Sequence, residues 1–292
     1  MRLALLIPLL SALAWALFDA LRKRLARDVK PLHLGLWLPL GQAPLLAAWA
    51  LWKEPFGLPA ASLPFLFGSA LCNVFALVLF LDALRRSPLS LTIPLLSLTP
   101  LGTTLLAWVF RHQAPTPAQW LGAGLVLAGA ATLGLRGGAW AGLGAFVKEP
   151  GVRRMAGTAL LWSATAVLDS GAVGAGAGAW YAPLLNLAVA LPLAAWMLRG
   201  AAGEGFGDAG RALLRLPLLS TVALLLGAAA LAVQIEAFRF ASVGFIEVLK
   251  RGLGMASAVL LGRLIFKEPV TAAKVVAVLL LTLGVALVVG WQ

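Results

Sequence analysis

Charged residues are scarce in this sequence. Lys, Arg, Asp and Glu make up 12% of the 292 residues, about half the share usual in soluble domains. Apolar residues account for 61%, and the mean hydropathy is +0.96. A water-soluble globular protein is therefore excluded. The single cysteine, Cys72, also excludes an internal disulfide.

Motifs of enzymes and metal sites are lacking as well. The sequence has no HExxH motif and no phosphate-binding glycine loop followed by Lys and Ser or Thr, and His33 and His112 lie far apart. We therefore expect no enzymatic activity, no cofactor and no metal site. Without an ATP site, any active transport must draw on an ion or substrate gradient.

Acidic residues are also few, with 11 Asp and Glu against 23 Lys and Arg, so the net charge is +12. The basic residues fall between apolar stretches, where they contact anionic lipid headgroups and set the orientation of membrane spans. We therefore expect membrane lipids as partners and no nucleic acid.

Long apolar runs are what the sequence does have. Ten runs are found at residues 3–20, 32–52, 63–84, 89–110, 118–135, 155–172, 178–198, 216–238, 243–263 and 271–291. Each approaches the roughly 20 residues that a membrane-spanning helix needs, and within lipid a helix satisfies its own backbone amides. The first run also fits a secretory signal, but we expect it to be retained as a span. The sequence predicts an all-α, multi-pass integral membrane protein.

An internal repeat divides these runs into two sets of five. SALAW at 11–15 matches TALLW at 158–162, and APLLAAW at 43–49 matches ALPLAAW at 190–196, both at an offset of 147. LDALR at 81–85 matches IEAFR at 235–239 after a small insertion. Five spans per copy force the second copy to be inverted, which is typical of transporters with a site near the midplane. Chance similarity between Leu- and Ala-rich helices is the alternative.

A family resemblance extends over nearly the whole chain. It is carried by the two five-helix halves, the mid-span Trp in the first helix of each half, and VLLGRLIFKEPVTAAKVVAVLLLTLGVALVV at 259–289. In these features the sequence resembles the EamA branch of the drug/metabolite transporter superfamily. The resemblance implies a bacterial inner-membrane protein that exports amino acids or similar small metabolites. The sequence departs from the family pattern in RHQAPTP at 111–117, where Ala114 stands in place of the usual acid.

The expected organisation follows from the repeat. Residues 1–136 form the first five-helix unit, 137–154 a connecting loop and 155–292 the second unit. We expect a monomer or a homodimer. The distribution of basic residues predicts both termini outside the cell, whereas the resemblance implies both termini inside.

Charges within the spans are the first candidates for a substrate site, because an ionised group at mid-bilayer costs about 3 kcal/mol or more without a partner. Glu247 precedes Lys250 by three residues and Arg251 by four, so the three share one helix face. We expect either a self-compensated packing cluster or a positive site for an anionic substrate. Asp169 is a candidate for ion coupling, and pairing with Arg251 or a helix end are its alternatives.

Two aromatic residues and one amide complete the predicted substrate contacts. Trp15 and Trp162 are equivalent in the repeat and are expected near the bilayer midplane, where they contact substrate or fill the core. Asn73 is a further candidate, with an interhelical hydrogen bond as the alternative.

Proline and glycine mark the predicted gates. Pro94 and Pro100 are expected to kink the fourth span. Gly252 and Gly254 make a weak point at the matching place in the ninth span. Together these features predict a secondary transporter or facilitator with alternating access, and an intramembrane enzyme or translocase acting on a lipid-linked substrate is the alternative.

Overall fold

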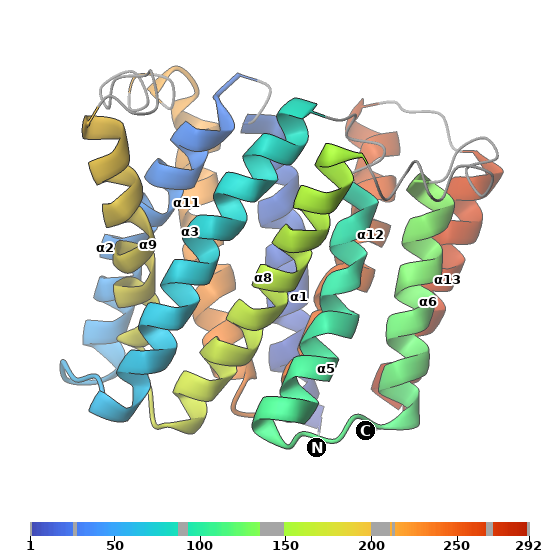
Figure 1. The fold of residues 1–292 in the computed structure, drawn as a ribbon, viewed down its shortest axis with the longest axis horizontal. Helices are drawn as coiled ribbons and strands as arrows, with labels where there is room; N and C mark the ends of the chain where they lie inside the picture. Colours follow the sequence, from blue (N-terminus) through green and yellow to red (C-terminus); the bar gives the residue numbers. More distant parts are fainter. Residues whose placement is uncertain are drawn as a thin grey trace. The chain divides into compact units, whose positions relative to one another are not determined.

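The computed structural model describes residues 2–25, 28–86, 93–134, 149–199, 211, 214–266 and 271–290. Within these residues it contains ten α-helices, two 3-10 helices and no strand (Figure 1). The α-helices are α1 (Arg2–Leu25), α2 (Pro31–Lys53), α3 (Leu63–Arg86), α5 (Thr99–Arg111), α6 (Pro117–Gly134), α8 (Pro150–Gly174), α9 (Tyr181–Leu198), α11 (Pro217–Ala237), α12 (Val243–Phe266) and α13 (Ala272–Gly290). The 3-10 helices are η1 (Ala60–Ser62) and η2 (Ile93–Leu98).

The helices fall on the ten apolar runs, which confirms the all-α membrane fold. Four candidate spans are long and apolar enough to cross a bilayer by length and composition, namely Leu32–Lys53, Ala60–Phe80, Tyr181–Leu198 and Pro217–Ala237. Leu95–Arg111 and Val275–Leu287 are shorter apolar helices. Several helices start at a proline, namely α2, α6, α8 and α11. The first amides of a helix have no acceptor within it, so the missing N–H of proline costs nothing at this position.

The chain folds as two compact units that do not coincide with its sequence halves. Unit 1 comprises residues 1–74 and 168–240, and unit 2 comprises 75–167 and 241–292. In unit 1, α1 packs on α11, and α2 packs on both α9 and α11. In unit 2, α13 packs on α6 and α12, and α12 packs on α5. Each unit therefore combines helices from both copies of the repeat.

Repeat-equivalent helices contact each other inside these units. The second helices of the two halves, α2 and α9, are in contact in unit 1, as are the fourth helices, α5 and α12, and the fifth, α6 and α13, in unit 2. The partners within each of these pairs run in opposite directions (Figure 1). This is the arrangement that two inverted copies of one helical unit require.

The contact between α6 and α13 depends on glycine. A Cβ atom on Gly129 would lie 2.9 Å from Leu281 Cγ, and a Cβ atom on Gly284 would lie 2.8 Å from the Gly122 carbonyl oxygen. The two contacts run in opposite chain order along the helices, so the pair is antiparallel. Because these glycines have no side chain, the backbones of α6 and α13 approach closely, as is common in membrane helices.

The fourth span is broken rather than kinked. Pro94 lies in η2 and Pro100 in the first turn of α5, so a 3-10 segment precedes an α-helix of 13 residues. The expectation of one bent α-helix is therefore corrected: a proline in the first turn of α5 starts a new helix instead of bending an existing one. In contrast, α12 continues through Gly252 and Gly254 without interruption.

Candidate functional site

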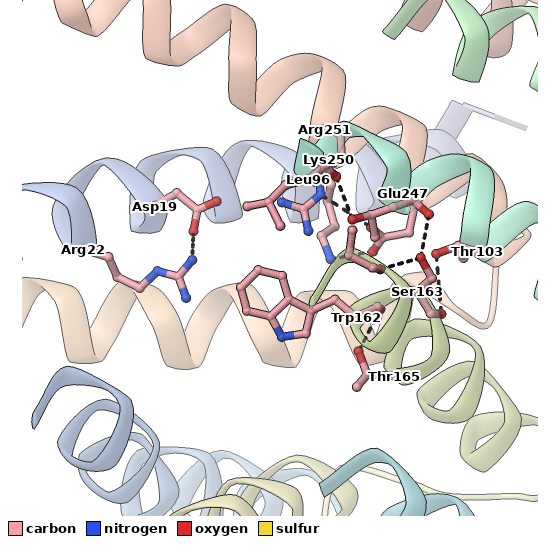
Figure 2. Close-up of polar contacts among 12 residues, drawn as sticks. Asp19, Arg22, Leu96, Thr103, Trp162, Ser163, Thr165, Glu247, Lys250 and Arg251 are labelled. Atoms are coloured by element: carbon pink, nitrogen blue, oxygen red, sulfur yellow. Dashed lines mark hydrogen bonds and ion pairs between the residues drawn. The ribbon is translucent and has the colours of Figure 1, made fainter. Parts of the chain in front are cut away.

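An ion cluster on α12 forms the centre of the predicted substrate site. Lys250 Nζ lies 2.6 Å from Glu247 Oε1, and Arg251 Nε lies 4.0 Å from Glu247 Oε2. The carboxylate is 1% exposed, whereas the Lys250 and Arg251 side chains retain 15% and 19% exposure. Figure 2 shows both cations directed toward Glu247. The spacing in the sequence predicted this pairing.

The cluster combines two cations with one carboxylate. Lys250 and Arg251 both face Glu247. Glu247 Oε2 and Arg251 Nε are buried without a hydrogen-bond partner among the described residues. A group that accepts a hydrogen bond from Arg251 Nε and donates one to Glu247 Oε2 would satisfy these two atoms.

Trp162 of α8 belongs to the same cluster. The Arg251 guanidinium lies 6.0 Å from the centre of the indole ring, within the range of a cation–π contact. The ring of Phe80 on α3 lies 5.5 Å from that of Trp162. The structure thus brings Trp162, Glu247, Lys250 and Arg251 together, as a cation site with an aromatic wall.

Ser163 fixes the position of this tryptophan, although the sequence did not single it out. Its Oγ donates to the carbonyl oxygens of Ala159 at 2.7 Å and Thr99 at 3.1 Å, so it ties α8 to the first turn of α5. Thr103 Oγ1 donates to the Ser163 carbonyl oxygen at 3.5 Å (Figure 2). A serine in an apolar span gives little sequence signal, because such residues commonly bond only within their own helix.

Asp169 anchors a second polar cluster, in unit 1. Its Oδ1 accepts hydrogen bonds from Ser69 Oγ at 2.6 Å and from Tyr181 OH at 2.7 Å. All three residues are buried, and α8 continues five residues beyond Asp169 to Gly174. The expectation that Asp169 ends a helix is therefore wrong. Tyr181 is the only tyrosine of the chain. That rarity is the sequence signal that could have drawn attention to it as a hydrogen-bond partner of Asp169.

Asn73 lies beside this second cluster. Its Nδ2 donates to the Ser69 carbonyl oxygen at 3.1 Å, one turn earlier on α3. Asn73 and Asp169 are therefore connected through Ser69, an arrangement that their spacing of nearly 100 residues did not predict. Among the described residues, no three His, Cys, Asp or Glu side chains come together as metal ligands.

Trp15 lies in an apolar cluster of unit 1. Its ring contacts Phe18 edge-to-face at 5.7 Å, and it packs against buried residues of α1, α2 and α11. The Arg22 guanidinium lies 5.1 Å from the Phe18 ring. Trp15 thus has a core-filling environment, whereas its repeat equivalent Trp162 faces a cation.

The glycines proposed as gates differ from each other. A Cβ atom on Gly252 would collide with the Val285 side chain of α13, whereas nothing lies within 4 Å of such an atom on Gly254. Gly252 therefore allows close packing of α12 on α13. Gly254 leaves open space beside the helix, one turn beyond Lys250.

Comparisons with known proteins give a match of part of the chain to one family and similarity to flippase subunits. Residues 2–135 match the EamA-like transporter family. The "Probable 4-amino-4-deoxy-L-arabinose-phosphoundecaprenol flippase subunit ArnE" of Salmonella paratyphi B and that of Salmonella typhimurium are each 38% identical over 64 residues, 22% of this chain. This chain spans 58% of the length of each of these relatives.

A solved crystal structure supports the fold alone. It superposes on 98% of this chain and on 96% of its own, with a TM-score of 0.74 and 22% sequence identity. The apolar helices of the described residues agree with the multi-pass membrane protein that the sequence predicts.

Proposed function

We propose that this chain, whose residues 2–135 match the EamA-like transporter family, moves small metabolites across the inner membrane by alternating access. It acts as a secondary transporter or facilitator, and export of amino acids or similar solutes is the direction favoured by its sequence resemblance. The match of residues 2–135 to a transporter family also supports the expectation that the chain is not an enzyme.

The cluster around Glu247 is the observation that carries this proposal. Charged side chains in a membrane-embedded helix are unfavourable unless a partner, a cavity or a ligand stabilises them. Lys250 and Arg251 both keep partial exposure, and Arg251 lies beside the Trp162 ring. These two cations would attract an anionic group of the substrate.

Asp169 is the proposed coupling residue. It is 5% exposed and bonded by two hydroxyl groups, so ion or proton binding at its carboxylate would change the contacts of both α3 and α9. A buried carboxylate that exchanges its partner is a common way to link an ion to a conformational change. The coupling ion itself is left to experiment.

Counterflow in liposomes tests these assignments. Purified protein is reconstituted, vesicles are loaded with single amino acids or monocarboxylates, and uptake of the labelled solute is followed. We expect Lys250→Ala and Arg251→Gln to slow counterflow at least tenfold, and Asp169→Asn to abolish its dependence on an imposed ion gradient. Arg22→Gln, which removes a cation from α1, is the matched control with unchanged transport. Wild-type rates in Lys250→Ala and Asp169→Asn would refute both site assignments.

Translocation of a lipid-linked substrate is the second candidate function. The similarity to a protein named as a phosphoundecaprenol flippase subunit favours it, and a phosphate would suit the Lys250 and Arg251 cluster equally well. The discriminating probe is a fluorescent polyprenyl phosphate in phosphatidylcholine vesicles, quenched from outside by dithionite. Complete quenching with the protein present and half quenching without it would favour translocation. Half quenching in both cases, with active counterflow of solutes, would favour the metabolite transporter.

A further inference from the structure

A small polar cavity lies within unit 2, where α5, α6 and α12 meet. Its volume is about 10 Å³, and all the residues that line it belong to this one unit. Besides apolar residues, the lining consists of Thr104 on α5, Gln113 in the connection from α5 to α6, Gln119 on α6, and Ser242 and Gly244 at the start of α12. The cavity is separate from the cluster around Glu247.

Two buried oxygen atoms of the lining have no hydrogen-bond partner among the described residues. They are Thr104 Oγ1, on a side chain that is 2% exposed, and Gln113 Oε1. Native structures rarely leave a buried hydroxyl or carbonyl oxygen unpaired, because the group loses its bonds to water and gains none in return. A partner inside the cavity would satisfy both atoms.

The start of α12 supplies hydrogen-bond donors to the same cavity. Gly244 is the second residue of α12, and the first amides of a helix have no acceptor within it. Ser242 Oγ accepts from Gln119 Nε2 at 3.0 Å and from the Phe245 amide at 3.4 Å. Its own hydroxyl proton is therefore available to an acceptor in the cavity.

Local hydrogen bonds fix the walls of the cavity. The Gln119 amide donates to Thr116 Oγ1 and the Thr116 amide donates to Gln119 Oε1, both at 3.2 Å, which is a reciprocal capping box at the start of α6. The Gln113 amide donates to the Ala107 carbonyl oxygen at 3.2 Å, at the end of α5. The polar groups are thus held in place by contacts that do not involve the cavity itself.

The size and the chemistry of the cavity select its ligand. One buried water needs a volume of about 10–15 Å³ and about two to four polar partners, and this cavity meets both requirements. A cation is disfavoured by the amide and hydroxyl protons at the start of α12, and an anion by the Gln113 carbonyl oxygen. A molecule of this size that both donates and accepts hydrogen bonds is water.

We propose that this cavity binds one ordered water molecule, which bridges α5, its connection to α6, and the start of α12. The water donates hydrogen bonds to Thr104 Oγ1 and Gln113 Oε1. It accepts one from the Gly244 amide or from the Ser242 hydroxyl. The bridge holds the first turn of α12, one turn before Glu247, and so it positions the helix that carries the ion cluster.

An experimental map of the full chain in nanodiscs, at a resolution that shows ordered water, tests the proposal directly. We expect a peak within hydrogen-bond distance of both Thr104 Oγ1 and Gln113 Oε1. Thr104→Val has nearly the same shape without the hydroxyl and should lose this peak, whereas Thr104→Ser keeps the hydroxyl and should keep it. The maps are repeated with N-methyl-D-glucamine in place of Na⁺, and the peak should persist.

A double-mutant cycle gives a second readout. Thr104 and Gln113 make no direct hydrogen bond, so a shared water is what couples them. We expect Thr104→Val and Gln113→Leu each to lower the melting temperature, and the double variant to lower it by no more than the larger single shift. Thr132→Val combined with Gln113→Leu is the additive control, because Thr132 Oγ1 donates to the Gly129 carbonyl oxygen of its own helix at 2.7 Å.

Several results would overturn the proposal. A wild-type map that shows other buried waters but no peak here would exclude the site. Additive shifts in the cycle of Thr104 and Gln113 would show that the two oxygens share no partner. Loss of the peak when Na⁺ is replaced would identify a cation as the ligand. All of these measurements are made without a transported solute, so the water site and the proposed function fail separately.

Discussion

Glu247 forms ion pairs with two cations from a nearly fully buried position. Glu247→Gln should lower the melting temperature in detergent strongly, because removing one partner of a buried ion pair costs about 3–5 kcal/mol and here leaves two cations without their anion. Asp19→Asn is the matched comparison: its pair with Arg22 is 42–43% exposed, and such pairs contribute about 1 kcal/mol or less. Equal melting temperatures for the two variants would contradict the importance of burial at Glu247.

Tyr181 donates one of two hydrogen bonds to the buried Asp169 carboxylate. Tyr181→Phe keeps the ring and removes only this donor, so we expect a loss of about 1–3 kcal/mol in the free energy of unfolding, the usual cost for a buried acceptor that loses a partner. Thr165→Val is the control, because Thr165 Oγ1 bonds only a carbonyl oxygen one turn back in α8. Denaturation in mild detergent, followed by near-UV circular dichroism, measures both. Identical midpoints would argue against a structural role for the Tyr181 hydroxyl.

Individual contacts were predictable only where they are local. The spacing of Glu247, Lys250 and Arg251 on one helix was sufficient to predict their pairing. The partners of Asp169 were not predictable, because Ser69 lies 100 residues away and serine in an apolar span has no distinctive pattern. The contact between Trp162 and Arg251 likewise depends on how α8 packs on α12, which no local rule specifies.

The packing of α6 on α13 depends on glycines at the contact. Gly129→Leu should weaken their packing, because its Cβ would already lie 3.0 Å from the Ala277 carbonyl oxygen and 2.9 Å from Leu281 Cγ. Gly124→Ala on the same helix has open space around its Cβ and should be neutral or slightly stabilising. Melting temperatures of the two variants test this. A stable Gly129→Leu variant would mean that the helices can separate without loss.

Helix positions followed from the sequence to within a few residues, because each apolar run ends at polar or turn-forming residues. The fourth span was the exception. Pro94 and Pro100 indicated an irregularity, but a proline is compatible with both a bend and a new start. The structure has the new start, and there the Thr99 carbonyl oxygen accepts a hydrogen bond from Ser163 on α8. This is a tertiary contact that the local sequence does not reveal.

For the whole molecule, the ten α-helices found among the described residues predict that both chain ends lie on one side of the membrane. Short epitope tags added before residue 1 and after residue 292 should therefore show the same accessibility to antibody in sealed, oriented vesicles. The basic residues predict the outer face and the family resemblance predicts the inner face, so the same measurement decides between them. Tags on opposite sides would refute the even number of spans.

The packing of the two halves was not predictable from their sequences. The repeat indicated two five-helix sets, whereas the compact units each combine helices of both sets. Local patterns such as SALAW and TALLW reveal that helices are related, but they carry no information on which helices touch. That choice depends on side-chain fit over long sequence distances, as at Gly129 and Leu281.

The junction of η2 and α5 has a mechanical consequence. A 3-10 helix rises about 2.0 Å per residue and an α-helix about 1.5 Å, so conversion of the six residues of η2 would shorten the fourth span by about 3 Å. The Thr99 hydroxyl donates to the Leu96 carbonyl oxygen at 2.7 Å, within this junction. The length of the fourth span along the membrane normal therefore depends on whether these six residues are in a 3-10 or an α conformation.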